Sequence, residues 1–165
     1  GLRTSEFLAL RWEHLDLRRK LMTVKAGYAY GETGTTKSGK ARTVPLNDTA
    51  MAALKAQRKV SFMSGELVFP DRNGEQMNKQ QLRKPWKRAI KAAGIRYVTR
   101  HDLRHTFASH LVQRGVSLQV VKELLGHAEL STTLRYAHLA PKNLEAAVAA
   151  LDNFGNEMGT NKKSG

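Results

Sequence analysis

The chain has 165 residues, 41% of them hydrophobic, which fits one domain with a real core. Its net charge of +14 points first to nucleic acid, because lysine and arginine neutralise phosphates and release counterions; an anionic membrane surface or a basic protein without such a partner are the alternatives. The absence of cysteine excludes a disulfide framework, a thiolate nucleophile and a cysteine zinc site.

The first half of the chain is predicted to combine short helices with short strands. Residues 4–12 fit a helix, and residues 47–60 fit another that Asn47 or Asp48 caps. The segment 27–41, rich in glycine, threonine and serine, is typical of a mobile hairpin loop. A turn is expected in DRNGEQ. Strands are expected at residues 20–26, 40–46 and 67–70.

The second half is predicted to be helical. Residues 78–93 fit a basic helix that Pro85 kinks or interrupts. Further helices are expected at residues 101–114, 117–126 and 130–138, with Gly115 and Gly126 ending the first two. A last helix starts near Pro141, whose missing N–H costs nothing in a first turn. Its apolar stripe comprises Leu144, Ala147, Val148 and Leu151.

These elements predict one α+β domain over residues 1–151, mainly α-helical with a small three-stranded antiparallel sheet. Residues 152–165 lack core-forming side chains and are expected to be a disordered tail. The chain begins at GLRTSE without a methionine, so we expect a fragment of a longer protein, monomeric on its own. No signal peptide and no apolar run near the roughly 20 residues that cross a bilayer is visible, which favours the cytoplasm and no membrane partner.

The segment 99–110, TRHDLRHTFASH, contains HDLRH, which is close to the HExxH pattern of zinc proteases. His101 and His105 lie four residues apart, and Asp102 has the acid position. However, Asp is shorter than Glu, and a third ligand has to come from elsewhere. Arg104 also places a permanent cation on the same face. We therefore expect no metal here, and no other cofactor.

A helical projection of this segment, at about 100° per residue, places Leu103, Phe107 and Leu111 on one stripe that should face the core. His101 and Arg104 lie beside that stripe. In a structural interpretation, Arg104 pairs with a carboxylate and His101 caps the helix. In a functional one they bind an anion, because a guanidinium matches two phosphate oxygens and histidine adds a donor. The net charge makes a DNA phosphate the plausible anion.

A second segment, residues 121–141, contains His127 directly after Gly126 at a helix end, and Tyr136 in a short helix or turn. Each residue alone fits a structural interpretation: a histidine beside a helix C-cap, and a core tyrosine with a hydrogen-bonded hydroxyl. Composition and spacing do not raise either above that.

Four blocks together resemble the tyrosine recombinase, or phage integrase, family in their order and spacing: GLRTSEFLALRW, TKSGKARTVPL, HDLRHTFASHL and LLGHAELSTTLRYAHL. The resemblance extends over nearly the whole chain, to about Leu151. It implies the catalytic domain that breaks and rejoins DNA in this family. Family members carry more chain before the first block, usually including a separate DNA-binding domain.

The resemblance also implies site residues. The family's first arginine lies in a G-x-R-x-x-E block, which Arg3 matches. Its lysine lies in the hairpin loop before R-x-V-P-L and matches Lys37, with Lys40 as the alternative register. Its H-x-x-R motif matches His101 and Arg104.

The remaining family positions lie in the last block. The L-G-H histidine matches His127, and the nucleophilic tyrosine matches Tyr136. Glu6 and Asp102 are interpreted as supporting residues that orient the arginines or close the helix starts. The other histidines are assigned to packing and local hydrogen bonds: His105, His110 and His138.

The implied reaction is phosphoryl transfer without a metal or ATP. Tyr136 attacks a DNA phosphodiester, forms a 3′-phosphotyrosine and frees a 5′-hydroxyl, and a second 5′-hydroxyl reverses the step on a new strand. Arg3 and Arg104, helped by the two matched histidines, stabilise the charge on the non-bridging oxygens. His101 is the candidate base, and Lys37 is the candidate donor to the leaving 5′-oxygen.

Basic residues outside this site are predicted to contact the DNA backbone, against the alternative of a solvated surface: Lys40, Arg42, Lys79, Arg83, Lys84, Lys87, Arg88 and Lys91. The apolar helix over residues 142–151 either packs on its own domain or, as the family suggests, docks on a neighbouring subunit. We favour docking, within a tetramer of the full-length protein on double-stranded DNA.

The favoured function is thus a site-specific recombinase, first of all a phage or genomic-island integrase. One alternative is a DNA-binding module without catalysis, against which the complete residue set argues. Another is a type IB topoisomerase, which the compact LGH…TTLRYAHL ending disfavours. A metal-dependent nuclease would need clustered carboxylates, which the sequence does not contain.

Overall fold

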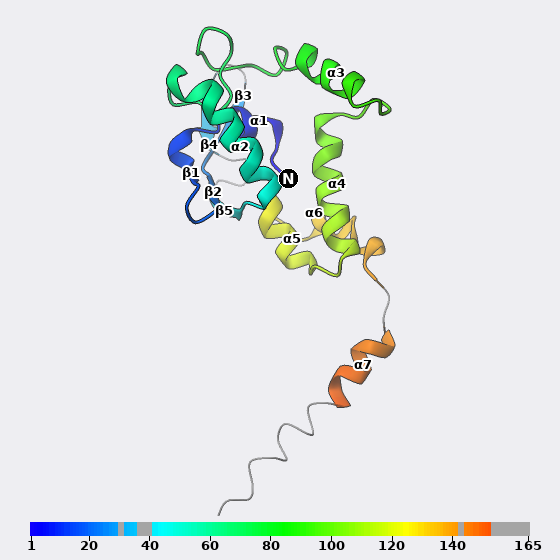
Figure 1. The fold of residues 1–165 in the computed structure, drawn as a ribbon. Helices are drawn as coiled ribbons and strands as arrows, with labels where there is room; N and C mark the ends of the chain where they lie inside the picture. Colours follow the sequence, from blue (N-terminus) through cyan, green and yellow to red (C-terminus); the bar gives the residue numbers. More distant parts are fainter. Residues whose placement is uncertain (30–31, 36–40, 142–143, 153–165) are drawn as a thin grey trace, which may run out of the picture.

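The computed structural model describes residues 1–29, 32–35, 41–141 and 144–152. Figure 1 shows α1, α2 and the strands on one side, with α4, α5 and α6 beside them. The helices are α1 (Thr4–Leu8), α2 (Asp48–Ser61), α3 (Arg83–Ala92), α4 (Arg100–Gln113), α5 (Leu118–Leu125), α6 (Ser131–Leu134) and α7 (Leu144–Asp152). Single 3-10 turns lie at Trp12–His14, Phe62–Ser64 and Ala137–Leu139.

A three-stranded antiparallel sheet forms the base of the β-containing part, as predicted. Its order is β1 (Leu15–Asp16), β2 (Leu21–Val24), β5 (Arg42–Pro45), and Met22 pairs with Val44 across β2 and β5. Side chains alternate along β2, so Met22 and Val24 are buried. They form one core cluster with residues of α2 and the connecting segments: Leu10, Leu46, Met51, Leu54 and Val68.

A second sheet, a two-stranded hairpin, lies where the sequence predicted only a loop. Strands β3 (Ala26–Ala29) and β4 (Glu32–Thr35) pair antiparallel, with Gly27 opposite Gly34. A Cβ added at Gly27 would lie 3.3 Å from the Ser5 hydroxyl oxygen, so β3 runs close against α1. The expectation of a loop was wrong for these strands, because pairing and this close approach suit glycine-rich sequence. Residues 30–31 and 36–40, including Lys37 and Lys40, lie outside the described residues.

A second core forms between α4, α5 and the segment that holds Tyr136. Ala108 and Val112 of α4 pack there with Val121 and Leu125 of α5. The predicted stripe was wrong at Leu103, which is 51% exposed, whereas Phe107 and Leu111 are partly buried against this core. The buried face of α4 instead contains Arg104, one turn before Ala108. The guanidinium can be buried there because two backbone carbonyls accept its hydrogen bonds.

Other boundaries differ from the predictions in ways that local chemistry explains. Helix α1 ends at Leu8, and a 3-10 turn follows. Helix α3 begins at Arg83, later than predicted, so that Pro85 lies in its first turn, where a missing N–H is tolerated. Residues 67–70 form only isolated bridges, not a strand. The cap at Asn47 matches the prediction, and the helix predicted from residue 117 is capped by Ser117.

Helix α7 stands away from the rest of the described chain in Figure 1. Three of its apolar side chains are exposed, Leu144, Val148 and Leu151, at 81%, 65% and 67%. Across the described residues, no helix has both the length and the apolar character that crossing a membrane requires. The tail predicted at residues 152–165 lies, apart from Asp152, outside the described residues.

The position of the α4 core can be tested with a matched pair of leucines. Leu125→Ala should reduce the free energy of unfolding by about 2–5 kcal/mol, because Leu125 is fully buried and its removal leaves a cavity. Leu103→Ala should cost less than about 1 kcal/mol, because half of that side chain already meets solvent. Urea unfolding of both variants measures the difference. Equal losses would mean that Leu103 belongs to the core after all.

Candidate active site

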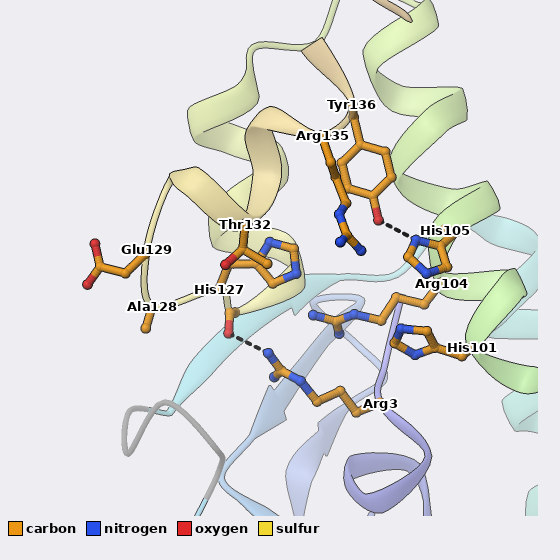
Figure 2. A pocket seen from close by; sticks show the side chains of 11 residues that line it. Arg3, His101, Arg104, His105, His127, Ala128, Glu129, Thr132, Arg135 and Tyr136 are labelled. Carbon is orange, nitrogen blue, oxygen red and sulfur yellow. Dashed lines mark hydrogen bonds between the residues drawn. The ribbon is translucent and has the colours of Figure 1, made fainter. Parts of the chain in front are cut away.

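A pocket of about 290 Å³ opens between the start of α1, the N-terminal half of α4, the end of α5 and the α6 segment (Figure 2). Five predicted site residues line it together: Arg3, His101, Arg104, His127 and Tyr136. They come from three distant parts of the sequence. The sixth predicted residue, Lys37, lies outside the described residues.

Arg3 is held at the mouth of α1 by its own first turn. Its backbone N–H donates to Oε2 of Glu6 at 2.8 Å, and its Nη1 donates to Oε1 at 2.8 Å. Its Nη2 reaches across the fold to the carbonyl of Gly126 at 3.1 Å. These bonds leave other N–H donors of the guanidinium available to the pocket.

Arg104 is the most enclosed cation of the site, with 4% of its surface exposed. Its Nη1 and Nη2 donate to the carbonyls of Gly1 and Leu125, both at 2.7 Å. Burial, followed by the neighbouring charge of Arg3, lowers the pKa of Arg104 to about 10. Because that value remains far above neutrality, Arg104 brings a fixed positive charge into the pocket.

Glu6 is the buried carboxylate behind these cations, 2% exposed. Besides Arg3 it accepts two bonds from Arg42, Nη1 to Oε1 at 3.0 Å and Nη2 to Oε2 at 2.8 Å, and it lies 3.9 Å from Nη1 of Arg104. Burial alone would raise the pKa of Glu6, but the bonds from Arg42 and Arg3 hold it below its ordinary value. The predicted supporting role of Glu6 fits this geometry.

Arg42 was predicted to contact the DNA backbone, which requires an exposed side chain, but its side chain points into the protein. Its side chain is 10% exposed, and its Nε donates to the carbonyl of Leu124 at 3.0 Å in addition to its two bonds to Glu6. Because these internal acceptors occupy the guanidinium, the structure argues against that contact. Arg42 instead ties β5 to the end of α5.

Three consecutive carbonyls at the end of α5 each accept a hydrogen bond from a different arginine: Leu124 from Arg42, Leu125 from Arg104 and Gly126 from Arg3. The last carbonyls of a helix lack intrahelical partners and carry partial negative charge, so they favour cations. Gly126 ends the helix with φ +66°, and a Cβ there would lie 2.6 Å from Nη1 of Arg42. Glycine is therefore required by both backbone and space.

His127 follows this helix end and faces the pocket. Its Nδ1 lies 2.8 Å from the hydroxyl of Thr133, which is fully buried. Burial, followed by the charges of Arg104, Arg3 and other arginines, lowers the pKa of His127 to about 4. His127 is thus neutral at physiological pH.

Tyr136 is 6% exposed, and its hydroxyl points to α4. The oxygen lies 2.6 Å from Nδ1 of His105, a contact that Figure 2 marks. The sequence assigned His105 to packing, but the spacing of four residues from His101 could have placed both rings on one face. Those two rings meet edge to face with centroids 4.6 Å apart.

Asp102 closes the start of α4, in line with one of its two predicted supporting roles. It exchanges bonds with Thr99 as a capping box, Thr99 N–H to Oδ2 at 2.7 Å and Asp102 N–H to the Thr99 hydroxyl at 3.2 Å. The cap orients the turn that carries His101. Pocket residues that the sequence analysis missed also include Glu129, Thr132 and Arg135.

The basic residues around α3 are all exposed: Lys79, Arg83, Lys84, Lys87, Arg88 and Lys91. Several of them border a broad groove between α3, the end of α2 and the connecting segment 70–81. No basic side chain of α3 has an acidic neighbour within the helix, whose sequence is RKPWKRAIKA. This surface is suited to a polyanion.

Taken together, the pocket presents guanidinium and imidazole donors around one tyrosine hydroxyl. Two acidic side chains lie near it. The carboxylate of Glu6 accepts hydrogen bonds from arginines behind the pocket, whereas Glu129 is exposed at the pocket edge. The site can therefore bind a phosphate-sized anion next to a tyrosine hydroxyl.

The buried carboxylate gives a test of this arrangement. Glu6→Gln should lower the free energy of unfolding at neutral pH by about 3–5 kcal/mol, because it leaves buried guanidiniums without their counter-charge. Since the folded-state pKa of Glu6 is lowered, its contribution is present above the ordinary value of 4.5 and is lost as pH falls through the folded pKa. The difference in the free energy of unfolding between the variant and wild type should therefore become smaller at acidic pH. Urea unfolding across pH, with exposed Glu13→Gln as control, measures it; equal stability of the two variants at neutral pH would contradict the account.

Comparisons with known proteins show the family of this chain. The model of the phage integrase family matches residues 1–143. The tyrosine recombinase XerC of Xanthomonas campestris is 40% identical over 141 residues, which cover 84% of this chain and 41% of that protein. The chain thus spans less than half the length of this relative.

Solved structures give the same result. The catalytic domain of bacteriophage HP1 integrase is 32% identical with a TM-score of 0.58, over 89% of this chain and 73% of that one. The XerH site-specific recombinase, solved bound to its difH substrate after cleavage, is 30% identical with a TM-score of 0.64, over 92% and 42%. The chain, with a catalytic-domain fold of this kind, belongs to the phage integrase family of tyrosine recombinases.

Proposed function

We propose that this chain is the catalytic part of a site-specific DNA recombinase that cuts and rejoins strands through a 3′-phosphotyrosine. The observation that carries the proposal is the convergence of Arg3, His101, Arg104 and His127 on one pocket with the Tyr136 hydroxyl. Integration of a phage or genomic island, in the cytoplasm of a bacterial host, is the favoured use. Residues 1–151 would form the catalytic domain.

The first step joins Tyr136 to DNA. Its oxygen attacks the phosphorus, and the 5′-oxygen leaves, so one phosphoester replaces another and no ATP is needed. Free N–H donors of Arg3 and Arg104 contact the non-bridging oxygens. Donors set in advance for this charge are worth about 3–4 kcal/mol each in a comparable oxyanion site. Lys37 is proposed to protonate the leaving 5′-oxygen.

Bound phosphate would change the state of His127. Burial and then the charges of four arginines lower its pKa, and an anion placed among those arginines would offset their charge. The pKa of His127 should then rise, which favours the protonated ring as a donor to the bound phosphate.

The exposed cations of α3 are proposed to hold the duplex. Lysine and arginine contacts to backbone phosphates position DNA without reading its sequence. Relatives support DNA as the partner, because XerH was solved bound to its difH substrate.

The nucleophile is tested by Tyr136→Phe in the full-length protein. Nicked duplexes tiled over the DNA that flanks its gene should trap an SDS-resistant protein–DNA adduct with wild type and none with the variant, because phenylalanine has no attacking oxygen. Exposed Tyr97→Phe, outside the pocket, should keep the adduct. An adduct that persists in Tyr136→Phe would mean a different nucleophile.

Other outcomes of the same assay separate the rival functions. Binding to several duplexes without any adduct would favour a DNA-binding module that lacks catalysis. Relaxation of a plasmid without an attachment site would favour a topoisomerase.

Helix α7 is proposed to dock on a neighbouring subunit of a tetramer on DNA. The exposed apolar side chains of Leu144, Val148 and Leu151 support an intermolecular contact, because burying them stabilises an assembly by roughly 1.5–3 kcal/mol each.

Sedimentation of the full-length protein with DNA tests the docking. Truncation at Pro141, or Leu144→Ser combined with Val148→Ser, should convert tetrameric complexes into smaller ones. Exposed Glu145→Gln on the same helix should leave them intact. Unchanged assembly in both disrupted variants would exclude a role for α7.

A further inference from the structure

The hydroxyl of Tyr136 has a specific partner that the sequence did not indicate. His105 places Nδ1 2.6 Å from it, with ring centroids 5.9 Å apart and planes tilted by 50°. Tyr136 is 6% exposed as a whole residue and lines the pocket. A buried hydroxyl needs such a partner, and here the partner is a titratable base.

His101, the base that the family resemblance suggested, is placed differently. It lies one turn earlier on α4 and is exposed. Its ring contacts the ring of His105 edge to face, and it does not contact the tyrosine in the described contacts. Figure 2 shows His105 between His101 and Tyr136. His101 is thus better placed to contact the anion in the pocket than to take a proton from the nucleophile.

The surroundings of His105 favour its neutral form. The charged and titratable groups that face it are His101, Asp102 and Arg104 on α4, with Arg135 and Tyr136 from the α6 segment. Burial, followed by His101 and Arg135, lowers the pKa of His105 below 6.5, while Asp102 opposes this. At neutral pH the ring therefore carries one nitrogen lone pair, and Nδ1 is the nitrogen at the hydroxyl.

We propose that His105 is a catalytic residue, whose Nδ1 accepts the hydrogen bond of the Tyr136 hydroxyl and takes its proton during attack. The inference rests on the proposed function and deepens it. As the bond from the tyrosine oxygen to phosphorus forms, the bond from phosphorus to the 5′-oxygen breaks and the tyrosine proton moves to Nδ1. In rejoining, an incoming 5′-hydroxyl forms a bond to phosphorus and returns its proton to the group that had protonated the leaving 5′-oxygen. The bond from phosphorus to the tyrosine oxygen breaks, and that oxygen recovers the proton from His105.

The first experiment measures the rate of adduct formation in single turnover, on the tiled nicked duplexes, with the full-length protein. His105→Asn keeps an amide near the position of Nδ1 but does not accept a proton at these pH values. It should slow attack by about a hundred- to ten-thousand-fold. His110→Asn, an identical change at an exposed site of the same helix, should keep the wild-type rate.

The pH profile separates proton transfer from packing. Wild type should lose activity as pH falls through the pKa of His105, below 6.5, because the protonated ring accepts nothing. This acid limb should persist in His101→Asn and disappear in His105→Asn. Added imidazole should partly rescue His105→Ala, where the ring has left space. Wild-type rates in His105→Asn, or an acid limb that follows His101, would overturn the proposal.

A second measurement does not depend on activity. Nitrogen-15 NMR of the histidine rings should find Nδ1 of His105 unprotonated at neutral pH, with a resonance that moves in Tyr136→Phe. A protonated Nδ1, or a resonance unaffected by the variant, would overturn the proposal even if Tyr136 is the nucleophile. If wild type forms no adduct on any duplex, the proposed function fails, and the NMR result alone decides on the hydrogen bond.

Discussion

The buried carboxylate of Glu6 is the interaction on which the site depends. It pairs with Arg3 and Arg42 and lies 3.9 Å from Arg104, so one anion offsets part of the charge of three enclosed cations. Guanidiniums this close repel one another, and burial adds the cost of desolvation. A single carboxylate reduces the repulsion between the guanidiniums without neutralising their total charge. The positive charge that remains is directed to the pocket.

The end of α5 completes this arrangement with neutral groups. The carbonyls of Leu124, Leu125 and Gly126 each accept from one arginine, which fixes the direction of three side chains without adding negative charge. The left-handed glycine makes this possible, because any Cβ at position 126 would collide with Arg42. The same turn then points His127 into the pocket. Helix termination and site assembly are thus one structural feature.

Sequence reasoning reached the parts of this structure that depend on local chemistry or on family motifs. Helix caps and glycine stops could be read from local residue patterns, and the matched residues of the pocket followed from the family motifs. The misassignments involve distant contacts: Arg42 meets the carbonyl of Leu124, 82 residues later, and His105 meets Tyr136, 31 residues later. Leu103 was placed in the core on hydrophobicity, but the partners of α4 bury the side that contains Arg104. No local pattern encodes which face a neighbour will cover.

The charges in the pocket also bear on when Tyr136 gives up its proton. A phenolate formed before the substrate binds would pair with the arginines of the pocket and block the phosphate site. A neutral base beside the hydroxyl avoids this conflict, because the proton stays on the oxygen until bond formation to phosphorus makes it acidic. The cations then serve the phosphate, and His105 serves the tyrosine. Under the proposed reaction, Glu6 and its arginines lie behind the pocket, and the His105–Tyr136 pair lies within it. This separation keeps the nucleophile protonated and leaves the phosphate site open.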